Sequence, residues 1–417
     1  MSGLLPSLGF RSLSDTSLAT ATRHARSRLQ VALLCSGAGA LLLEAIWFRQ
    51  LGWALGNTVR AGAATLAAFM LGLALGALLS LWLTRRIRRP VRVFVGTESL
   101  VAILGLAVIL LLSRGETTIA TWLGPLLDQP VLLQALRFWL SVGVLLLPAM
   151  AMGIGLPLLI CAWGDTPALG PLLGRLYAAN TLGGVLGLLV GEWLLIPLAG
   201  LPAASIVALT LVLASAALAW PLRDATQTAG EMTRRIAPWP LLVVTAGIGA
   251  AMLAIEVVGF RLISLQTAGT TRSLTLGVAC VLLGLAAGSR LAALWTERVP
   301  AAARNIGLLT AAACAAWLCG IGLAAFGAHL GHPLARWGLA LPGLFIPVSV
   351  CSGALLTLIA ERIRQSELHP GTATAQLLAA NAAGAALGAG LAGSWCAGRR
   401  GSGCRSRGVW PCAVPRT

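Results

Sequence analysis

The sequence of 417 residues contains no lysine, and charged residues of both signs make up only 10% of it. Soluble domains carry about 25% charged residues, so this composition excludes a soluble globular enzyme. All thirty basic residues are arginines, and they exceed the thirteen acids to give a net charge of +17. These arginines lie between long apolar runs and form no basic face. We interpret them as topology signals and contacts to anionic lipid headgroups, and we expect no nucleic-acid partner.

The chain also lacks the residue patterns that mark most catalytic and metal sites. Its nine cysteines include no C-x-x-C pair, and its four histidines are scattered over predicted loops and the N-terminal tail. It contains no nucleophile elbow, Walker loop or zincin motif. The sequence therefore predicts no catalytic residue, no metal site and no bound cofactor.

Apolar runs dominate what is present, with 58% hydrophobic residues and a mean hydropathy of +0.87. A helix crosses a bilayer in about 20 residues, and tryptophan, arginine and proline mark where the runs end. The predicted spans lie near residues 30–55, 59–84, 92–113, 136–162, 176–199, 201–221, 240–262, 273–295, 306–328, 338–360 and 374–395. We therefore expect an all-α polytopic transmembrane helix bundle of about eleven helices, with the lipid bilayer as its partner.

Arginine is distributed unevenly between the loops. Four arginines precede the first span, five follow the second span and three follow the sixth, whereas the intervening loops are poorer in arginine. By the positive-inside rule the arginine-rich segments face the cytoplasm. We predict a bacterial inner-membrane protein with a cytoplasmic N-terminal tail over residues 1–28 and a cytoplasmic linker over residues 223–238.

The parts of the chain on either side of this linker are related in sequence. A shift of 212 positions places Glu44 on Glu256, and a shift of 201 positions places Asn180 on Asn381. Because six spans separate corresponding helices, both copies enter the membrane from the same side. This arrangement predicts two parallel six-helix repeats of the major-facilitator-like kind.

The two predicted repeats cover residues 29–222 and 239–395. A complete second repeat would need a twelfth helix, so we expect this repeat to be truncated. Residues 396–417 are rich in arginine, glycine, serine and cysteine, and this composition resembles out-of-frame translation of GC-rich DNA. We expect them to form a disordered tail.

Charged residues inside the spans are the first candidates for a polar site, because each costs about 2.5 kcal/mol or more without a partner or a polar cavity. Four of them occupy corresponding positions in the two repeats: Glu44, Arg49, Glu256 and Arg261. Residues five apart diverge by about 140° around a helix, which disfavours pairing within one helix. Pairing across the halves would join Glu44 to Arg261. It would also join Glu256 to Arg49, and the two ion pairs would clamp the halves together. The alternatives are a substrate or proton site and arginine side chains that snorkel to the headgroups.

Three further polar residues belong to the candidate intramembrane site. Glu192 lies in the fifth span and has no acidic counterpart in the second repeat, so it is either a one-sided buried acid or a solvated residue near the outer end. Asn180 and Asn381 are interhelical hydrogen-bond donors or, in the alternative, site residues. We expect Glu98, near the start of the third span, to lie at the membrane interface.

Glycine and proline predict how the helices pack and where they break. Glycines recur at a spacing of four, which lets helix backbones approach closely. The pairs are Gly72 and Gly76, Gly183 and Gly187, Gly284 and Gly288, and Gly384 and Gly388. Pro148 and Pro157 in the fourth span and Pro347 in the tenth predict interrupted helices near a central site.

Several segments carry a resemblance to a known family. The segments are Ser36 to Arg49, Gly56 to Val59, Ala67 to Gly76 and Arg175 to Gly183. They resemble the membrane-embedded spermidine synthase-like proteins, also described as fused major-facilitator/spermidine synthase proteins. The resemblance covers most of residues 31–393.

This resemblance implies a transporter-like or anchoring role in polyamine-related metabolism, with a small cationic substrate. Fuller members of the family continue into a soluble aminopropyltransferase-like domain with a Gly-rich nucleoside loop, and this chain contains no such loop. One alternative is therefore the membrane component of a polyamine aminopropyltransferase whose catalytic domain is absent from, or separate from, this chain. A nonfunctional truncation is a further alternative.

Overall fold

The computed structural model describes residues 10–56, 58–126, 128–162, 169–222, 236–266, 271–298, 341–364 and 368–398, together with residues 314, 317 and 320. Within these ranges the structure does not describe the side chains of residues 10–26, 261–266, 271–274 and 395–398, nor those at a few single positions. Apart from those three residues, the predicted span near 306–328 lies outside the described residues. The linker from 223 to 235 and the tail after 398 lie outside them as well.

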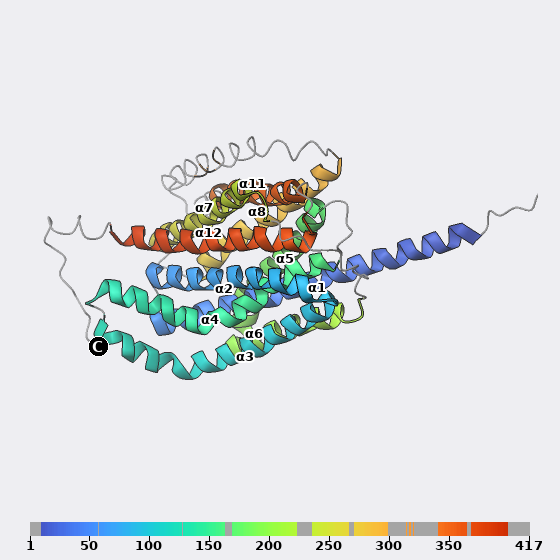
Figure 1. Cartoon of the computed structure of the whole chain (residues 1–417). Coiled ribbons are helices and arrows are strands. Elements are labelled where there is room, and N and C mark those ends of the chain that lie inside the picture. Colours follow the sequence, from blue (N-terminus) through green and yellow to red (C-terminus); the bar gives the residue numbers. More distant parts are fainter. Residues whose placement is uncertain are drawn as a thin grey trace, which may run out of the picture.

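The described chain is helical throughout and contains no strand (Figure 1). Its long helices are α1 (Phe10–Leu55), α2 (Val59–Arg86), α3 (Pro90–Leu123), α4 (Pro130–Cys161), α5 (Leu169–Val190), α6 (Ile196–Ala219), α7 (Trp239–Gln266), α8 (Thr271–Arg298), α11 (Leu341–Arg364) and α12 (Pro370–Gly398). Nine of the described segments are long and apolar enough to cross a membrane, and one of them, residues 169–219, contains both α5 and α6. The expectation of an all-α transmembrane bundle is confirmed.

These helices begin where the sequence supplies helix-start signals. Proline occupies the first position of α3, α4 and α12, where its missing N–H costs nothing. Thr58 caps α2, since its hydroxyl accepts a hydrogen bond from the Ala61 backbone N–H at 3.2 Å. Between the ends, leucine and alanine favour helix, and a helix satisfies its backbone polar groups internally as a bilayer requires.

A π-helix lies inside the fifth predicted span, and a sharp turn at Gly200 joins that span to the sixth. The π-helix η2 (Gly191–Leu195) follows α5 directly, and Gly200 then adopts φ 78° and ψ 173°. This φ lies in the region that only glycine enters without strain. Beyond Gly200 the chain returns along α1, where Ala208 and Val212 of α6 lie against Gly39.

The expected breaks in the fourth and tenth spans are wrong. α4 runs without interruption through Pro148 and Pro157, and α11 runs through Pro347. A transmembrane helix tolerates an internal proline because neighbouring helices and small backbone adjustments satisfy the freed carbonyl group. The breaks in the first half lie instead at η2 and Gly200.

The two halves of the bundle, α1 to α6 and α7 to α12, pack their helices in equivalent ways. Four glycines lie directly against backbone carbonyl groups of the neighbouring helix: Gly183 on Leu34, Gly187 on Ala38, Gly384 on Ala246 and Gly388 on Ala250. The first two pairs join α5 to α1, and the last two join α12 to α7. Since corresponding residues make corresponding contacts, the structure contains the parallel repeat that the sequence predicted.

A second set of glycines repeats in the same manner between other helices. Gly76 of α2 lies against the Met150 carbonyl group of α4, and Gly288 of α8 lies against the Val350 carbonyl group of α11. A Cβ atom at any of these positions would overlap the facing backbone. The glycine stripes therefore set the helix spacing in both halves.

The halves meet chiefly through two helix pairs, α2 with α12 and α5 with α8, and α4 with α12 and α5 with α11 also touch. Figure 1 shows α12 lying alongside α2. Apolar side chains from both halves form this contact, including Leu66 of α2, Val257 of α7 and Ala389 of α12. The central space that carries the site lies between these two pairs.

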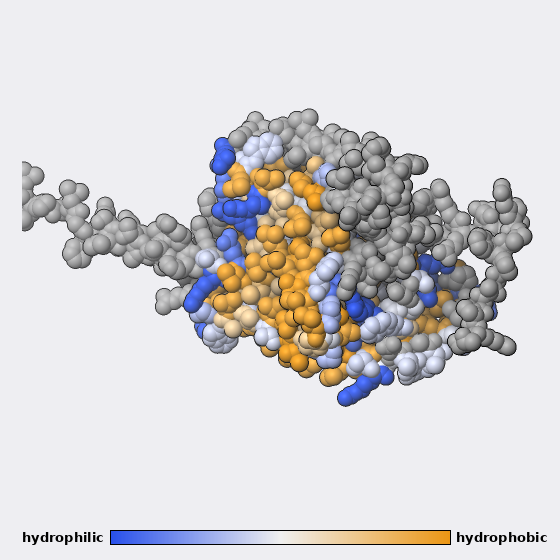
Figure 2. All heavy atoms as spheres, turned by 180° about the vertical axis from the view of Figure 1, so that it is seen from behind, coloured by the Kyte–Doolittle hydropathy of each residue, from blue (hydrophilic) through white to orange (hydrophobic). Residues whose placement is uncertain are grey.

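The outer surface matches a lipid environment. Figure 2 shows hydrophobic residues over the middle of one face, with hydrophilic residues gathered toward its edges. Tryptophan side chains near helix ends are exposed: Trp53, Trp82, Trp122, Trp220 and Trp239. Such a distribution is typical of a multi-pass membrane protein with an aromatic belt.

Candidate functional site

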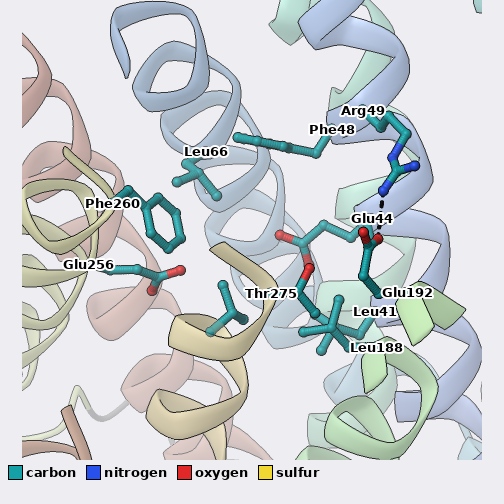
Figure 3. Close-up of a pocket in the computed structure, with 12 residues that line it drawn as sticks. Leu41, Glu44, Phe48, Arg49, Leu66, Leu188, Glu192, Glu256, Phe260 and Thr275 are labelled. Atoms are coloured by element: carbon teal, nitrogen blue, oxygen red, sulfur yellow. Dashed lines mark hydrogen bonds and ion pairs between the residues drawn. The ribbon is translucent and has the colours of Figure 1, made fainter. Parts of the chain in front are cut away.

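A cavity of about 90 Å³ lies between the two halves, and we call it the central cavity. It is lined by residues of α1, α2, α5, η2, α7 and α8: Leu41, Glu44, Ala45, Phe48, Arg49, Leu66, Leu188, Glu192, Glu256, Phe260, Thr275 and Val278. Most of the lining is apolar, and two phenylalanine rings form part of the wall. Four of the seven candidate polar residues meet here (Figure 3).

Glu44 and Glu256 enter the central cavity from opposite halves. Glu44 projects from α1 and Glu256 from α7, and their carboxylates extend toward one another across the space (Figure 3). Both side chains are partly buried, and neither makes a hydrogen bond or an ion pair with another described residue. Two acids that face each other in an apolar space attract a cation or a proton.

Arg49 and Glu192 form an ion pair in the wall of the same cavity. An Arg49 guanidinium nitrogen (Nη2) donates to Glu192 Oε2 at 2.6 Å, joining α1 to η2. The predicted pairing of Arg49 with Glu256 is therefore wrong, because Arg49 finds its partner within its own half. The predicted pairing of Glu44 with Arg261 involves a side chain outside the description.

The two asparagines lie away from the central cavity. The Asn180 carbonyl group packs against Gly37 of α1, and the Asn381 carbonyl group packs against Gly249 of α7 in the same way. This equivalence indicates that both asparagines belong to the helix packing of the repeat. Asn180 also lines a second cavity, which sequence reasoning did not predict.

The second cavity has a volume of about 250 Å³ and shares Leu41 and Glu44 with the central cavity. Polar groups from three helices line it: Ser36 and Glu44 of α1, Glu98 of α3, and Tyr177, Asn180 and Thr181 of α5. Glu98 is only 7% exposed, so neighbouring helices cover it, and its position at the membrane interface stays a prediction. The signal that could have located it is its place eight residues inside an apolar helix that begins at Pro90.

Polar contacts join the halves beyond the second cavity. The Gly170 backbone N–H, at the start of α5, donates to Glu361 Oε2 of α11 at 2.9 Å. Arg175 of α5 forms an ion pair with Glu297 of α8, with 3.0 Å between nitrogen and oxygen. Both contacts lie at the end of the bundle where α5 begins and where α8 and α11 end.

Metal ligands do not gather in the described part of the chain. No group of three or more histidine, cysteine or acidic residues is placed to hold a metal ion there. The central cavity offers carboxylates within an apolar and aromatic wall.

The backbone is similar to those of solved membrane transporters. A crystal structure of a bacterial homologue of the iron transporter ferroportin, in an outward-facing state, gives a TM-score of 0.53 over 89% of this chain and 91% of that chain, at 13% sequence identity. The human organic anion transporter MFSD10 (TETRAN) gives a TM-score of 0.50 over 89% of this chain and 93% of that chain, at 14% identity. No protein-family profile and no curated protein matches the sequence. The fold is major-facilitator-like.

The resemblance to the spermidine synthase-like family is wrong. The similar structures are transporters, and no comparison supports a link to spermidine synthases or to polyamines. The segments that suggested the family contain the glycine stripes and the Glu44 to Arg49 spacing, which the structure explains by helix packing and by the cavity wall. Close packing and buried charge pairs are general needs of transmembrane bundles, so motifs built from them do not distinguish one family from another.

Proposed function

We propose that this multi-pass membrane protein transports a small organic ammonium cation through the space between its two halves. The observation that carries this proposal is the pair Glu44 and Glu256, which face each other in the central cavity with no cationic partner among the described residues. The similarity of the fold to transporters supports it. Rocking of one repeat, residues 29–222, against the other, residues 239–395, would expose the site to each side in turn.

The charge and shape of the cavity select the class of substrate. A bound cation would offset the repulsion between two carboxylates, whereas an anion would add to it. Arg49 gives an anion little electrostatic attraction, because the Glu192 carboxylate already neutralises its charge. A cavity of about 90 Å³ has room for roughly three water molecules at 30 Å³ each, which sets the scale of a small ammonium group.

The wall of the central cavity fits alkyl groups around such a charge. Leu41, Leu66 and Leu188 offer apolar contacts, and Phe48 and Phe260 present aromatic rings. Aromatic side chains recognise quaternary ammonium ions through cation–π attraction, which is worth about 2 kcal/mol when the groups are desolvated. This combination favours a quaternary or alkylated ammonium ion over a bare metal ion.

We further propose that the protein lies in the bacterial inner membrane with its N-terminus in the cytoplasm. The excess of arginine in the first 28 residues and around the junction of α2 and α3 supports this orientation. In this orientation the end of the bundle where Glu361 and Arg175 join the halves faces the cytoplasm.

Counterflow in proteoliposomes tests the proposed transport. Vesicles containing the purified full chain are preloaded with unlabelled tetramethylammonium, and uptake of the ¹⁴C-labelled ion is measured. Wild-type protein should accelerate uptake over empty vesicles. Glu44→Gln and Glu256→Gln should each raise the half-saturating concentration about 10- to 100-fold, because each removes one of the two carboxylates that attract the cation. Attraction between charges about 5 Å apart is worth about 0.8 kcal/mol in bulk water and about 3.3 kcal/mol at an effective dielectric of about 20, and 1.4 kcal/mol is tenfold.

The matched control is Asp128→Asn, which removes an exposed acid outside both cavities and should leave uptake unchanged. Parallel vesicles receive ⁵⁵Fe²⁺ or labelled benzoate. Counterflow of iron or benzoate without counterflow of tetramethylammonium would contradict the proposed substrate class. Counterflow of none of the three would contradict transport of these ions by this site.

A further inference from the structure

Glu98 is a buried acid that the central cavity does not include. Its side chain projects from α3 into the second cavity, where the Ser36 hydroxyl of α1 donates to Glu98 Oε1 at 2.8 Å. Glu98 is 7% exposed, and no described residue forms an ion pair with it. A buried carboxyl group with one hydroxyl donor and no cation is poised to exchange a proton.

No described positive charge lines the second cavity beside Glu98, and Arg28 of α1 is exposed. α3 contacts α1, α4 and α6. α6 contains no charged residue, and the single charged residue of α4, Arg137, lies in the half of the helix remote from Gly155, which packs beside Glu98. α1 contributes Ser36 and the acid Glu44 to the second cavity.

The remaining walls of the second cavity add polar but uncharged groups. α5 contributes Tyr177, Asn180 and Thr181, while α2 and α8 contribute apolar side chains. On α5 the charged residue Arg175 is already paired with Glu297, and on α3 Arg92 is exposed. Two acids, Glu44 and Glu98, are thus the charged groups that line this space.

Glu44 connects the two cavities, because it lines both of them. Its single negative charge can balance a cationic substrate in the central cavity or a proton shared with the second cavity, but it cannot balance both at once. The second cavity has room for about eight water molecules at 30 Å³ each, enough to connect Glu44 with Glu98 by hydrogen bonds.

We propose that the second cavity is a proton site and path, in which Glu98 and Glu44 exchange a proton through water, so that the proton and the organic cation are carried in opposite directions. This inference rests on the proposed function, because it names the ion that is exchanged for the cation. In one half of the cycle a proton binds the Glu44 carboxylate and the cation leaves. In the other half the cation binds Glu44, and the proton moves to Glu98 and on to the water beyond it.

The test uses two independent measurements on the full chain. The first is uptake of ¹⁴C-tetramethylammonium, a permanent cation, into vesicles with an acidic lumen, with the membrane potential held by potassium and valinomycin. Wild-type uptake should exceed that of vesicles with equal pH on both sides by about tenfold. Glu98→Gln should reduce the effect of the gradient to less than twofold, and Asp128→Asn should retain it in full.

The second measurement is infrared difference spectroscopy of the purified protein between acidic and alkaline pH. Wild-type protein should show a protonated carboxyl band that is missing in Glu98→Gln and present in Asp128→Asn. Ser36→Ala should keep this band and move the midpoint of the pH profile of exchange to higher pH, because the Ser36 hydroxyl stabilises the ionised carboxylate. A purely structural role of Ser36 would leave that midpoint in place.

The outcomes separate the two proposals. Absence of counterflow in wild-type vesicles contradicts the proposed transport, and the infrared band then still decides whether Glu98 binds a proton. Counterflow that responds equally to a gradient in wild type and in Glu98→Gln overturns the proton path. A carboxyl band that persists in Glu98→Gln overturns Glu98 as the proton site. Stimulation of uptake by a sodium gradient in place of a pH gradient overturns the choice of ion. Size-exclusion profiles of each variant establish that it is folded.

Discussion

The ion pair between Arg49 and Glu192 should be the strongest single polar contact between α1 and the segment that follows α5. The perturbation is a double-mutant cycle made of Arg49→Gln, Glu192→Gln and the double variant. Each single change leaves the other charge in a largely buried place, since the side chains are 18% and 9% exposed. Glu192→Gln keeps the side-chain volume, and the volume lost in Arg49→Gln is common to the single and the double variant, so it cancels in the coupling energy.

The magnitude follows from the geometry of the pair. A separation of 2.6 Å is that of a short, charge-assisted hydrogen bond. Such bonds contribute about 1.5–3 kcal/mol, and removing one partner of a fully buried pair costs about 3–5 kcal/mol. Because this pair borders a cavity and Arg49 keeps some exposure, we expect each single change to lower the free energy of unfolding by about 2–3 kcal/mol. The double change should cost about 1.5–3 kcal/mol less than the sum of the single changes.

The assay is equilibrium unfolding in mixed detergent micelles, followed by the fluorescence of the fourteen tryptophans. A matched control is the same cycle on Arg175 and Glu297, whose side chains are 35% and 36% exposed. Solvent screening should reduce the coupling of that pair to about 0.2–1 kcal/mol. Additivity within about 0.5 kcal/mol at Arg49 and Glu192 would refute the reasoning, because it would mean that the two charges do not interact in the folded bundle.

Three further predictions concern packing, a contact between the halves and orientation. Gly187→Val should lower the free energy of unfolding by about 1–3 kcal/mol or more, because a Cβ atom there meets the backbone of α1, whereas Gly143→Val, where a Cβ atom meets nothing within 4 Å, should change it little. Glu361→Ala should lower the free energy of unfolding by about 1 kcal/mol through loss of the acceptor at the start of α5, and an unchanged midpoint in the same assay would contradict this role. A cysteine placed at Arg88, between α2 and α3, should resist an impermeant maleimide in intact cells and react in inverted vesicles, and labelling of intact cells would reverse the orientation.

The amino-acid sequence by itself determined the class of fold and the repeat. A bilayer forces each long apolar run to satisfy its backbone internally, so helix is the outcome for runs of this composition whatever their neighbours. The glycine spacing predicted the close helix pairs as well, because only a missing side chain allows backbones to touch. The contacts of Gly183 and Gly384 with equivalent residues confirm both the spacing and the shift between the repeats.

The tertiary structure alone decided which charged groups meet. Whether Arg49 pairs with Glu256 or with Glu192 depends on the rotation of η2 and on the distance between the halves, and neither is encoded in the period of an apolar run. The same holds for Glu98, which has the sequence environment of an interfacial residue and becomes buried because α1 and α4 cover it. Hydrophobic periodicity fixes that a helix forms and roughly where it ends, whereas a polar site is made by side chains of several helices, and the angles between those helices come only from packing.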